Sequence, residues 1–353
     1  MFPSLPARPT TPPGRLMAAL ATLVLVLAAC SGSASPSPLA SASTAIATAA
    51  PTATPLPTPT ATPVPAFPAT LKDDEGTSVT IASEPKRIVS LTPATTEILF
   101  GLGVGDRVVA TDDGSDYPAA AANLKHVATF SSVDTEQVVQ LGADLVVAGG
   151  LGFTPADAIT KLRSLKIPVL VIYAPSVDGV LKDIELIGTA VGAADEAKTM
   201  TDGMSTDLKA ISDAAAARAT TAGAKPRVYY EIGYTDATGQ IYAPADKSFL
   251  AEMVTLAGAE PITTGDPNTY EIPLEKLIQR DPQVIIIGVN PFYSPAPASL
   301  ATRPGWKVMT AIKDGQVRAV HDTEITRPGP RLAIGLRALA LGIWPDLQLP
   351  PAS

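Results

Sequence analysis

Cysteine and histidine are scarce in this chain of 353 residues. Cys30 is the only cysteine, so an internal disulfide and a cysteine-based metal site are both excluded. His126 and His321 are the two histidines, which leaves little for an ordinary zinc site. The sequence has no nucleophile elbow and no nucleophile paired with a base, so it does not predict an enzyme. We expect no resident metal or cofactor.

Basic residues are also in the minority. Lysine and arginine number 26 against 34 aspartates and glutamates, and the formal net charge is −8. Arg8 and Arg15 are the only charged residues before position 70, so the rest of the chain is more acidic still. Such a surface is poorly suited to phosphate groups, and we expect no nucleic acid partner. A hydrophobic content of 46% over this length is sufficient for two ordinary domains.

The N-terminal segment has the features of an export signal. Arg8 and Arg15 precede an apolar run at 16–29 that is short for a membrane span. The run ends in Leu27-Ala28-Ala29-Cys30, which resembles the bacterial lipobox. We interpret residues 1–29 as a lipoprotein signal peptide and Cys30 as the lipidated residue, which predicts anchoring at the outer face of the cell membrane. The alternative is an ordinary signal peptide with an incidental cysteine.

The next segment, residues 30–69, carries no charge and is dominated by serine, threonine, proline and alanine. It cannot bury a core, and its prolines favour extended conformations. We therefore predict a semi-stiff tether, with the folded part of the chain beginning at residue 70.

One long helix organises the remainder of the chain. Over residues 194–220, apolar side chains recur at strides of three and four, which predicts an amphipathic helix. At 1.5 Å per residue this helix is about 40 Å long, enough to span a small domain. Its apolar stripe is Ala197, Met200, Met204, Leu208, Ile211 and Ala215.

Two similar stretches flank this helix. Each has a strand led by arginine, a glutamate 48 or 49 residues later and, 13 residues beyond it, a glycine that ends an apolar strand. These residues are Arg87, Glu136 and Gly149 in one stretch and Arg227, Glu275 and Gly288 in the other. Such internal similarity indicates a duplicated unit. We predict an α/β fold in which an N-terminal lobe at 70–193 and a C-terminal lobe at 221–353 are joined by the helix at 194–220.

Local signals support a parallel, doubly wound sheet in the first lobe, because strands and helices alternate. Thr92 followed by Pro93 is typical of a helix start. In the second lobe we expect a polar, aromatic loop at 233–242 and a helix at 306–312. The glycines at 149–152 lack the spacing of a dinucleotide-binding loop, and they indicate either the glycine-lined rim of a ligand site or a tight turn.

Three segments carry a resemblance to a known family. They are residues 87–97 from Arg87 to Glu97, the run Ser115-Asp116-Tyr117-Pro118, and residues 136–149. In this order they resemble the substrate-binding proteins of iron-chelate and cobalamin ABC importers, and the similarity extends over roughly 75–343. The resemblance implies two Rossmann-like lobes bridged by one long helix, with the ligand held between the lobes. It also implies a partner, an ABC permease dimer with a cytoplasmic ATPase.

The resemblance assigns roles to individual residues. In the family, glutamates at the positions of Glu136 and Glu275 dock onto arginines of the permease, although a helix dipole alone also explains an acid at a helix start. Phe130 stands where cobalamin-binding members have a tryptophan that packs on the corrin ring. Gly114 and Gly149 replace aromatic contacts of those members, so other aromatic residues must compensate if the ligand is a corrinoid.

We predict a corrinoid ligand first, with a ferric siderophore or haem as the alternative. Haem requires an axial ligand, for which His321, Tyr270 and Tyr293 are candidates. A receptor without transport or an enzyme on the same fold is a less favoured hypothesis. Arg327 meets either an anionic edge of the ligand or a carboxylate, and Asp116 and Tyr117 either touch the ligand or build a turn. The predicted ligand contacts are Thr92, Pro93, Asp116, Tyr117, Phe130, Gly149, Gly150, Tyr234, Tyr242, Tyr270, Phe292, Tyr293 and Arg327.

Overall fold

The computed structural model describes residues 66–150, 152–291 and 293–351. The predicted signal peptide, Cys30, most of the predicted tether and Phe292 lie outside the described residues. In the described part of the chain, no helix is both long enough and apolar enough to cross a membrane.

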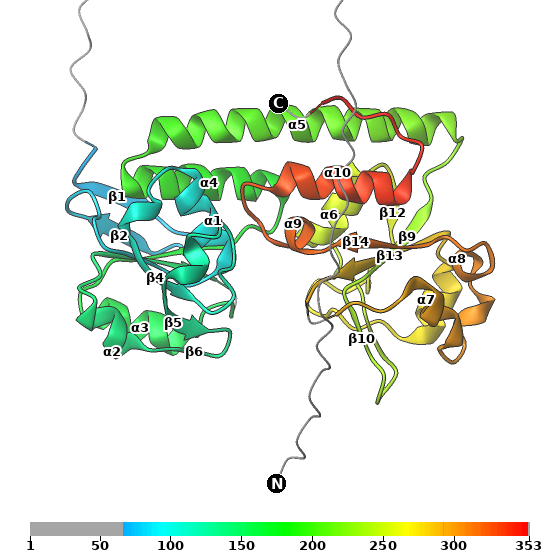
Figure 1. Ribbon diagram of the computed structural model, residues 1–353, viewed down its shortest axis with the longest axis horizontal. Coiled ribbons are helices and arrows are strands. Elements are labelled where there is room, and N and C mark those ends of the chain that lie inside the picture. Colours follow the sequence, from blue (N-terminus) through cyan, green and yellow to red (C-terminus); the bar gives the residue numbers. More distant parts are fainter. Residues whose placement is uncertain (1–65, 151, 292, 352–353) are drawn as a thin grey trace, which may run out of the picture. The chain divides into compact units, whose positions relative to one another are not determined.

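The predicted long helix is confirmed as α5 (Ala194–Thr221), which extends along both lobes (Figure 1). It packs against α4 (Val177–Val191) of the first lobe and against α6 (Phe249–Leu256) and α10 (Leu332–Ile343) of the second. Its exposed face carries lysine–aspartate pairs four residues apart, which suits a solvent-facing helix surface. Its buried stripe is Ala197, Thr201, Met204, Leu208, Ile211, Ala215 and Ala219.

The first lobe contains a six-stranded sheet in the order β6-β5-β4-β3-β7-β8. All neighbouring strands are parallel except β5 and β6. Strands β3, β7 and β8 are buried along their whole length, as expected for a sheet that helices cover on both sides. The strand bounds are β3 (Ile88–Ser90), β4 (Val108–Asp112), β5 (Lys125–Thr129), β6 (Ser132–Val133), β7 (Leu145–Gly149) and β8 (Val169–Ile172).

Capping side chains set the starts of several helices in this lobe. Thr92 is the N-cap of α1 (Pro93–Gly101), and its hydroxyl accepts a hydrogen bond from the Thr95 amide, as the sequence predicts. Ser176 caps α4 in the same way, and Gly192 ends that helix in a left-handed conformation. The other helices are α2 (Thr135–Gln140) and α3 (Ala156–Ser164), with single 3₁₀ turns at Gly105–Arg107 and Ala121–Asn123.

The folded part starts slightly earlier than predicted. Strand β1 (Ala69–Lys72) pairs antiparallel with β2 (Ser78–Ile81) in a separate two-stranded sheet, so Ala69 belongs to the lobe and not to the tether. Phe67 is partly buried against the main hydrophobic core. A four-residue strand with alternating exposure is too short to be distinguished from the Pro/Ala-rich sequence before it.

The second lobe contains a four-stranded, fully parallel sheet in the order β12-β9-β13-β14. Each large sheet takes its strands from one side of α5 in the sequence, which confirms the predicted α/β fold of two parallel-sheet lobes joined by one long helix. The strands are β9 (Arg227–Glu231), β12 (Glu260–Pro261), β13 (Val284–Val289) and β14 (Val317–His321). Besides α6 and α10, the helices are α7 (Leu274–Arg280), α8 (Thr310–Lys313) and α9 (Thr323–Thr326).

Two local predictions in this lobe are wrong. Residues 233–242 form a hairpin of β10 (Gly233–Thr235) and β11 (Gln240–Tyr242) instead of an open loop, because Gly239 adopts the positive φ that closes the turn. The predicted helix at 306–312 is divided into a 3₁₀ turn (Trp306–Val308) and α8, because Met309 between them is extended. A further 3₁₀ segment covers Pro297–Thr302.

Candidate binding site

Exposed aromatic side chains follow three parallel strands of the first lobe. Tyr117 follows β4, Phe130 follows β5 and Phe153 follows β7, with exposures of 47%, 76% and 54%. In open α/β sheets, ligands bind at the carboxyl ends of the strands. Large apolar side chains that stay in water at this edge offer flat surface to a ligand. Phe153 is absent from the sequence prediction, although Gly149 marks the end of the strand before it.

The predicted glycine contacts have a packing explanation. Gly149 is buried, and a Cβ on it would lie 2.8 Å from both the Thr92 and the Phe153 side chains. Gly150 is also buried and donates its amide to the Ile172 carbonyl. Gly149 lets the loop after β7 approach the start of α1 closely, and Gly150 lies against the end of β8. A direct contact of either glycine with a ligand stays a prediction, as it does for Thr92 and Pro93, which are half-buried.

The second lobe supplies tyrosines from its hairpin and from the loops around it. Tyr234 and Tyr242 lie on β10 and β11 and are half-buried, whereas Tyr270 is 49% exposed. Glu271 bridges the hairpin at Tyr242, which places Tyr270 beside β11. The hydroxyl of Tyr293 donates to the Glu231 carboxylate at 2.5 Å, so this phenol already has a partner.

A buried ion pair that sequence reasoning missed supports this tyrosine cluster. Glu231 ends β9 with no exposed surface, and its carboxylate is held by Arg303 at 2.5 Å. The Arg303 guanidinium also stacks over the rings of Tyr234 at 3.9 Å and Trp306 at 4.5 Å. Burial, and then the bond to Glu231, raise the pKa of Tyr293, which keeps its phenol neutral. The available signal was Glu231 itself, since an acid inside an apolar strand requires a buried partner.

Arginines of the second lobe form ion pairs with carboxylates of the first. Glu97 of α1 is almost fully buried and binds Arg327 at 3.0 Å and Arg331 at 2.6 Å. Arg327 also contacts Asp116 at 2.6 Å, and Arg331 lies 4.1 Å over the ring of Tyr117. The Glu97 carboxylate is the main cause of the raised pKa of Arg331. Asp116, Tyr117 and Arg327 therefore join the lobes in this structure, and a ligand contact for them stays a prediction.

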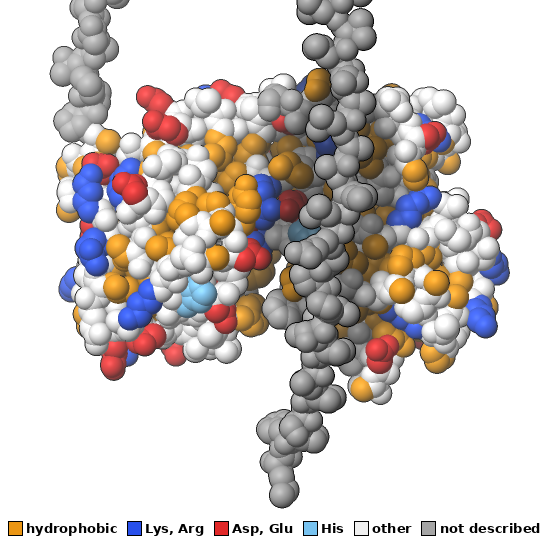
Figure 2. Space-filling model, in the orientation of Figure 1, with side chains coloured by type: hydrophobic (Ala, Val, Ile, Leu, Met, Phe, Trp, Pro, Cys, Tyr) orange, Lys and Arg blue, Asp and Glu red, His pale blue; other side chains and the backbone are white. Residues whose placement is uncertain are grey.

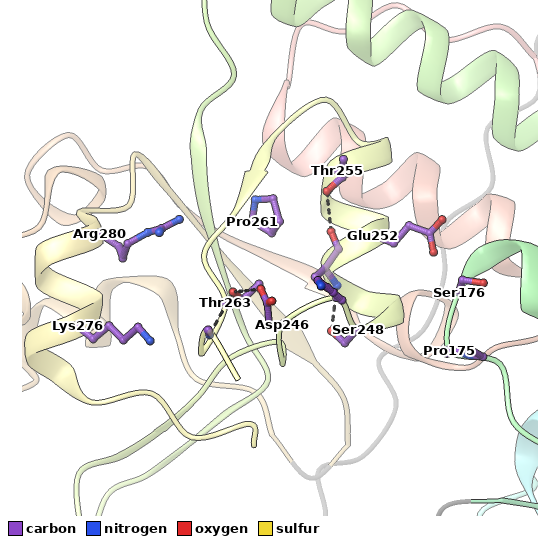
Figure 3. Close-up of a pocket in the computed structure, with 13 residues that line it drawn as sticks. Pro175, Ser176, Asp246, Ser248, Glu252, Thr255, Pro261, Thr263, Lys276 and Arg280 are labelled. Atoms are coloured by element: carbon purple, nitrogen blue, oxygen red, sulfur yellow. Dashed lines mark hydrogen bonds between the residues drawn. The ribbon is translucent and has the colours of Figure 1, made fainter. Parts of the chain in front are cut away.

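A second polar contact joins the lobes at a pocket. Glu252 of α6 accepts a hydrogen bond from the Val177 amide at the start of α4, at 2.8 Å. The pocket has a volume of about 630 Å³. In Figure 3, Lys276 and Arg280 reach it from α7, opposite Glu252 of α6. The residues lining it do not include Phe130 or Tyr270, so this pocket is separate from the exposed aromatic side chains.

Glu136 and Glu275 occupy equivalent positions in the two lobes. Each lies in the first turn of a short helix, α2 or α7, and each is exposed. Within the described residues, neither carboxylate has a hydrogen-bond or ion-pair partner. Two unpaired acids at matching positions are available to an external partner with positive charge.

Charged side chains of both signs are mixed on the face drawn in Figure 2, without a large basic area. Within residues 66–150, 152–291 and 293–351, no three or more His, Cys, Asp or Glu side chains gather as a metal site would require.

Comparison with known proteins identifies relatives over most of the described chain. The model of a family described as "Periplasmic binding protein" matches residues 88–323. The chain is 33% identical to the ABC transporter substrate-binding lipoprotein YvrC of Bacillus subtilis, over 79% of this chain and 87% of the relative. It is 31% identical to a cobalamin-binding protein of Halobacterium salinarum, over 78% and 74%.

Solved structures agree with this fold. The haem-binding protein RhuT from Roseiflexus matches with a TM-score of 0.65 and 23% identity, covering 74% of this chain and 99% of that one. The vitamin B12-binding protein BtuF of Vibrio cholerae matches with a TM-score of 0.60 and 23% identity, covering 73% and 96%.

Proposed function

Because the chain belongs to the periplasmic binding protein family and is an ABC transporter substrate-binding protein, not an enzyme, we propose that its cargo is a corrinoid. It binds this cargo between the strand ends of its two lobes and delivers it to an ABC permease. The cobalamin-binding relative from Halobacterium supports this choice of ligand.

The exposed aromatic residues at the strand ends carry the proposal. Tyr117, Phe130 and Phe153 from one lobe and Tyr270 from the other keep about half or more of their surface in water. A corrin ring is wide, flat and largely apolar, so stacking on such side chains removes apolar area of both partners from water. Mostly apolar walls with a few polar groups are the usual composition of small-molecule sites.

Haem is the alternative that the structure supports less well. Haem iron is usually bound by an axial side chain of the protein, whereas cobalamin arrives with axial ligands of its own and needs none from the protein. Of the candidate axial ligands, Tyr293 donates a hydrogen bond to Glu231, and His321 contacts Glu324. Tyr270 is the remaining candidate. If haem is the cargo, Tyr270→Phe should abolish the axial charge-transfer band.

Titration of the purified chain with three ligands tests the cargo. The chain with Cys30→Ser is mixed with cyanocobalamin, haemin or ferrichrome, and heat and visible absorbance are recorded. We expect saturable one-to-one binding of cyanocobalamin and weaker or no binding of the other two. Tight binding of haemin or ferrichrome without cyanocobalamin would replace the proposed cargo by that ligand, and binding of none would reject the cargo class.

Phe130→Ala should weaken cyanocobalamin binding. One aromatic contact contributes about 0.5–1.5 kcal/mol, so the Kd should rise about twofold to twelvefold. Ile334→Ala is the matched control, because Ile334 is an apolar side chain with 58% exposure on α10, away from the strand ends. Calorimetry of both variants measures the effect. Equal Kd values for the two variants would remove Phe130 from the site.

Glu136 and Glu275 are proposed to bind arginines of the permease, one glutamate for each half of its dimer. Their matching helix positions and their lack of partners among the described residues support this role. Glu136→Ala combined with Glu275→Ala should reduce cyanocobalamin uptake by cells while the Kd of the purified protein is unchanged. A weakened Kd would instead assign these residues to the ligand site.

Lipid anchoring through Cys30 is proposed from the Leu27-Ala28-Ala29-Cys30 sequence and from the similarity to a lipoprotein. The full chain should partition into the detergent phase of Triton X-114, and Cys30→Ala should move it to the aqueous phase. Detergent partitioning of Cys30→Ala would contradict the anchor.

A further inference from the structure

The arginines that lead the two similar sequence stretches make the same hydrogen bond. Arg87 donates from Nε to the Leu141 carbonyl at the end of α2, at 2.5 Å. Arg227 donates from Nε to the Arg280 carbonyl at the end of α7, at 2.8 Å. Each accepting carbonyl lies five residues after the glutamate of that helix, Glu136 or Glu275.

The backbone around these arginines repeats as well. The Arg87 amide donates to the Asp144 side chain at 2.9 Å, and the Asp144 amide donates back to the Arg87 carbonyl at 3.0 Å. In the second lobe, the Arg227 amide donates to the Gln283 side chain at 3.0 Å, and the Gln283 amide donates back at 2.9 Å. These reciprocal bonds fix each arginine against the segment that leaves the helix.

The residue after each accepting carbonyl has the same unusual conformation. Gly142 and Asp281 both have a positive φ, of 64° and 43°. A left-handed residue ends a helix and turns its last carbonyls outward, where an arginine can reach them. The cation then lies at the negative end of the helix dipole, and the glutamate lies at the positive end.

We propose that Arg87 and Arg227 are positioning residues for permease docking. Each holds the far end of a helix of six or seven residues, so the carboxylate in its first turn has a defined position. Helices this short are marginal without tertiary contacts. This inference rests on the proposed docking role of Glu136 and Glu275.

Arginine-to-methionine variants test it, because methionine retains much of the apolar stem and removes the donors. Each lobe offers a matched control. Arg107 donates to the Val191 carbonyl at the end of α4, at 2.9 Å, and Arg318 donates to the Gly342 carbonyl near the end of α10, also at 2.9 Å. These controls lose the same kind of bond from helices that carry neither glutamate.

The measurement is the Kd of the full, membrane-extracted chain for its permease–ATPase complex in nanodiscs, which requires no cargo. Arg87→Met and Arg227→Met should each weaken binding roughly tenfold, a coupling of about 1.4 kcal/mol. Arg107→Met and Arg318→Met should bind as the unchanged chain does. In a Glu136→Ala background, Arg87→Met should cause no further loss.

Other outcomes separate the two proposals. If Glu136→Ala and Glu275→Ala leave the Kd unchanged, the docking role is wrong and the inference falls with it. If these glutamate variants weaken binding but the arginine variants do not, only the positioning role is wrong. The positioning role is also wrong if the losses of binding free energy caused by the arginine and glutamate variants are fully additive.

Amide hydrogen exchange provides a readout that does not depend on the permease. Arg87→Met should speed exchange in residues 135–142 and leave the first sheet protected, with cyanocobalamin binding unchanged. Faster exchange throughout the lobe would make Arg87 a general stability residue and overturn the inference. If Arg87→Met folds poorly, Arg87→Lys, which retains a cation and a donor, should restore protection of α2.

Discussion

Replacing Glu97 by glutamine tests the ionic contact between the lobes. The Glu97 side chain is 2% exposed and accepts one hydrogen bond from Arg327 and two from Arg331, over 2.6–3.0 Å. Glutamine retains the shape but removes the charge. Loss of one partner from a buried ion pair costs about 3–5 kcal/mol. Arg327 and Arg331 retain Asp116 and Glu324, so we expect the lower end, about 3 kcal/mol.

Urea unfolding followed by circular dichroism measures this loss, and thermal unfolding should show a midpoint lower by roughly 5–10 °C. Asp178→Asn is the control, because the Asp178–Lys182 pair is 71% and 73% exposed and should contribute less than about 0.5 kcal/mol. A loss below about 1 kcal/mol for Glu97→Gln would refute the reasoning, since the remaining carboxylates would then suffice for both arginines.

Two further predictions concern stability. Burial, and then the neighbouring Asp74, raise the pKa of Asp183 to about 8, so the folded chain keeps a proton that the unfolded chain releases near pH 4. The free energy of unfolding should therefore fall by roughly 2 kcal/mol, relative to Asp183→Asn, as pH rises from 5.5 to 7.5. Urea unfolding at several pH values measures it, and the same pH dependence in both proteins would contradict this. A Cβ at Gly335 would lie 2.0 Å from the Glu324 carbonyl oxygen, so Gly335→Ala should cost about 3 kcal/mol in thermal unfolding. A Cβ added at Gly203 on α5 would have no neighbour within 4 Å outside the backbone of its own helix, so Gly203→Ala should be neutral or stabilising. Equal losses for both alanine variants would reject the steric argument.

The parts of the fold that sequence predicts are those with long or repeated patterns. The stripe from Ala197 to Ala215 extends over most of α5, so its period is visible without tertiary information. The repeat of Arg87 and Arg227 predicts a duplicated lobe, and Thr92 before Pro93 predicts the start of α1. Each of these signals is local or periodic, which is the form that sequence reasoning can use.

The missed features depend on contacts between distant residues. The hairpin strands β10 and β11 have three residues each, too few for alternation to be recognised. Arg303 lies in an irregular segment and binds Glu231, 72 residues away, so no local motif marks it. Arg327 was expected to meet a ligand or a carboxylate, and its partners in the structure include Glu97, 230 residues away. Of the aromatic contacts predicted for the cargo, Tyr117 and Phe130 follow strands of the first lobe, but which contacts face the cargo depends on the distance between the lobes.

The lobes are attached to each other at more points than the long helix alone. Besides α5, the Glu97 ion pairs and the bond from the Val177 amide to Glu252 cross between them. These attachments restrict rotation of one lobe against the other, so we expect the distance between the strand ends of the two lobes to change little when a ligand binds. A preorganised site of this kind loses little conformational entropy when it binds a ligand, and it selects ligands by their thickness and outline. Discrimination among tetrapyrrole-like ligands would then depend on the side chains that line the site. Substituting a few of them would change the ligand without changing the fold.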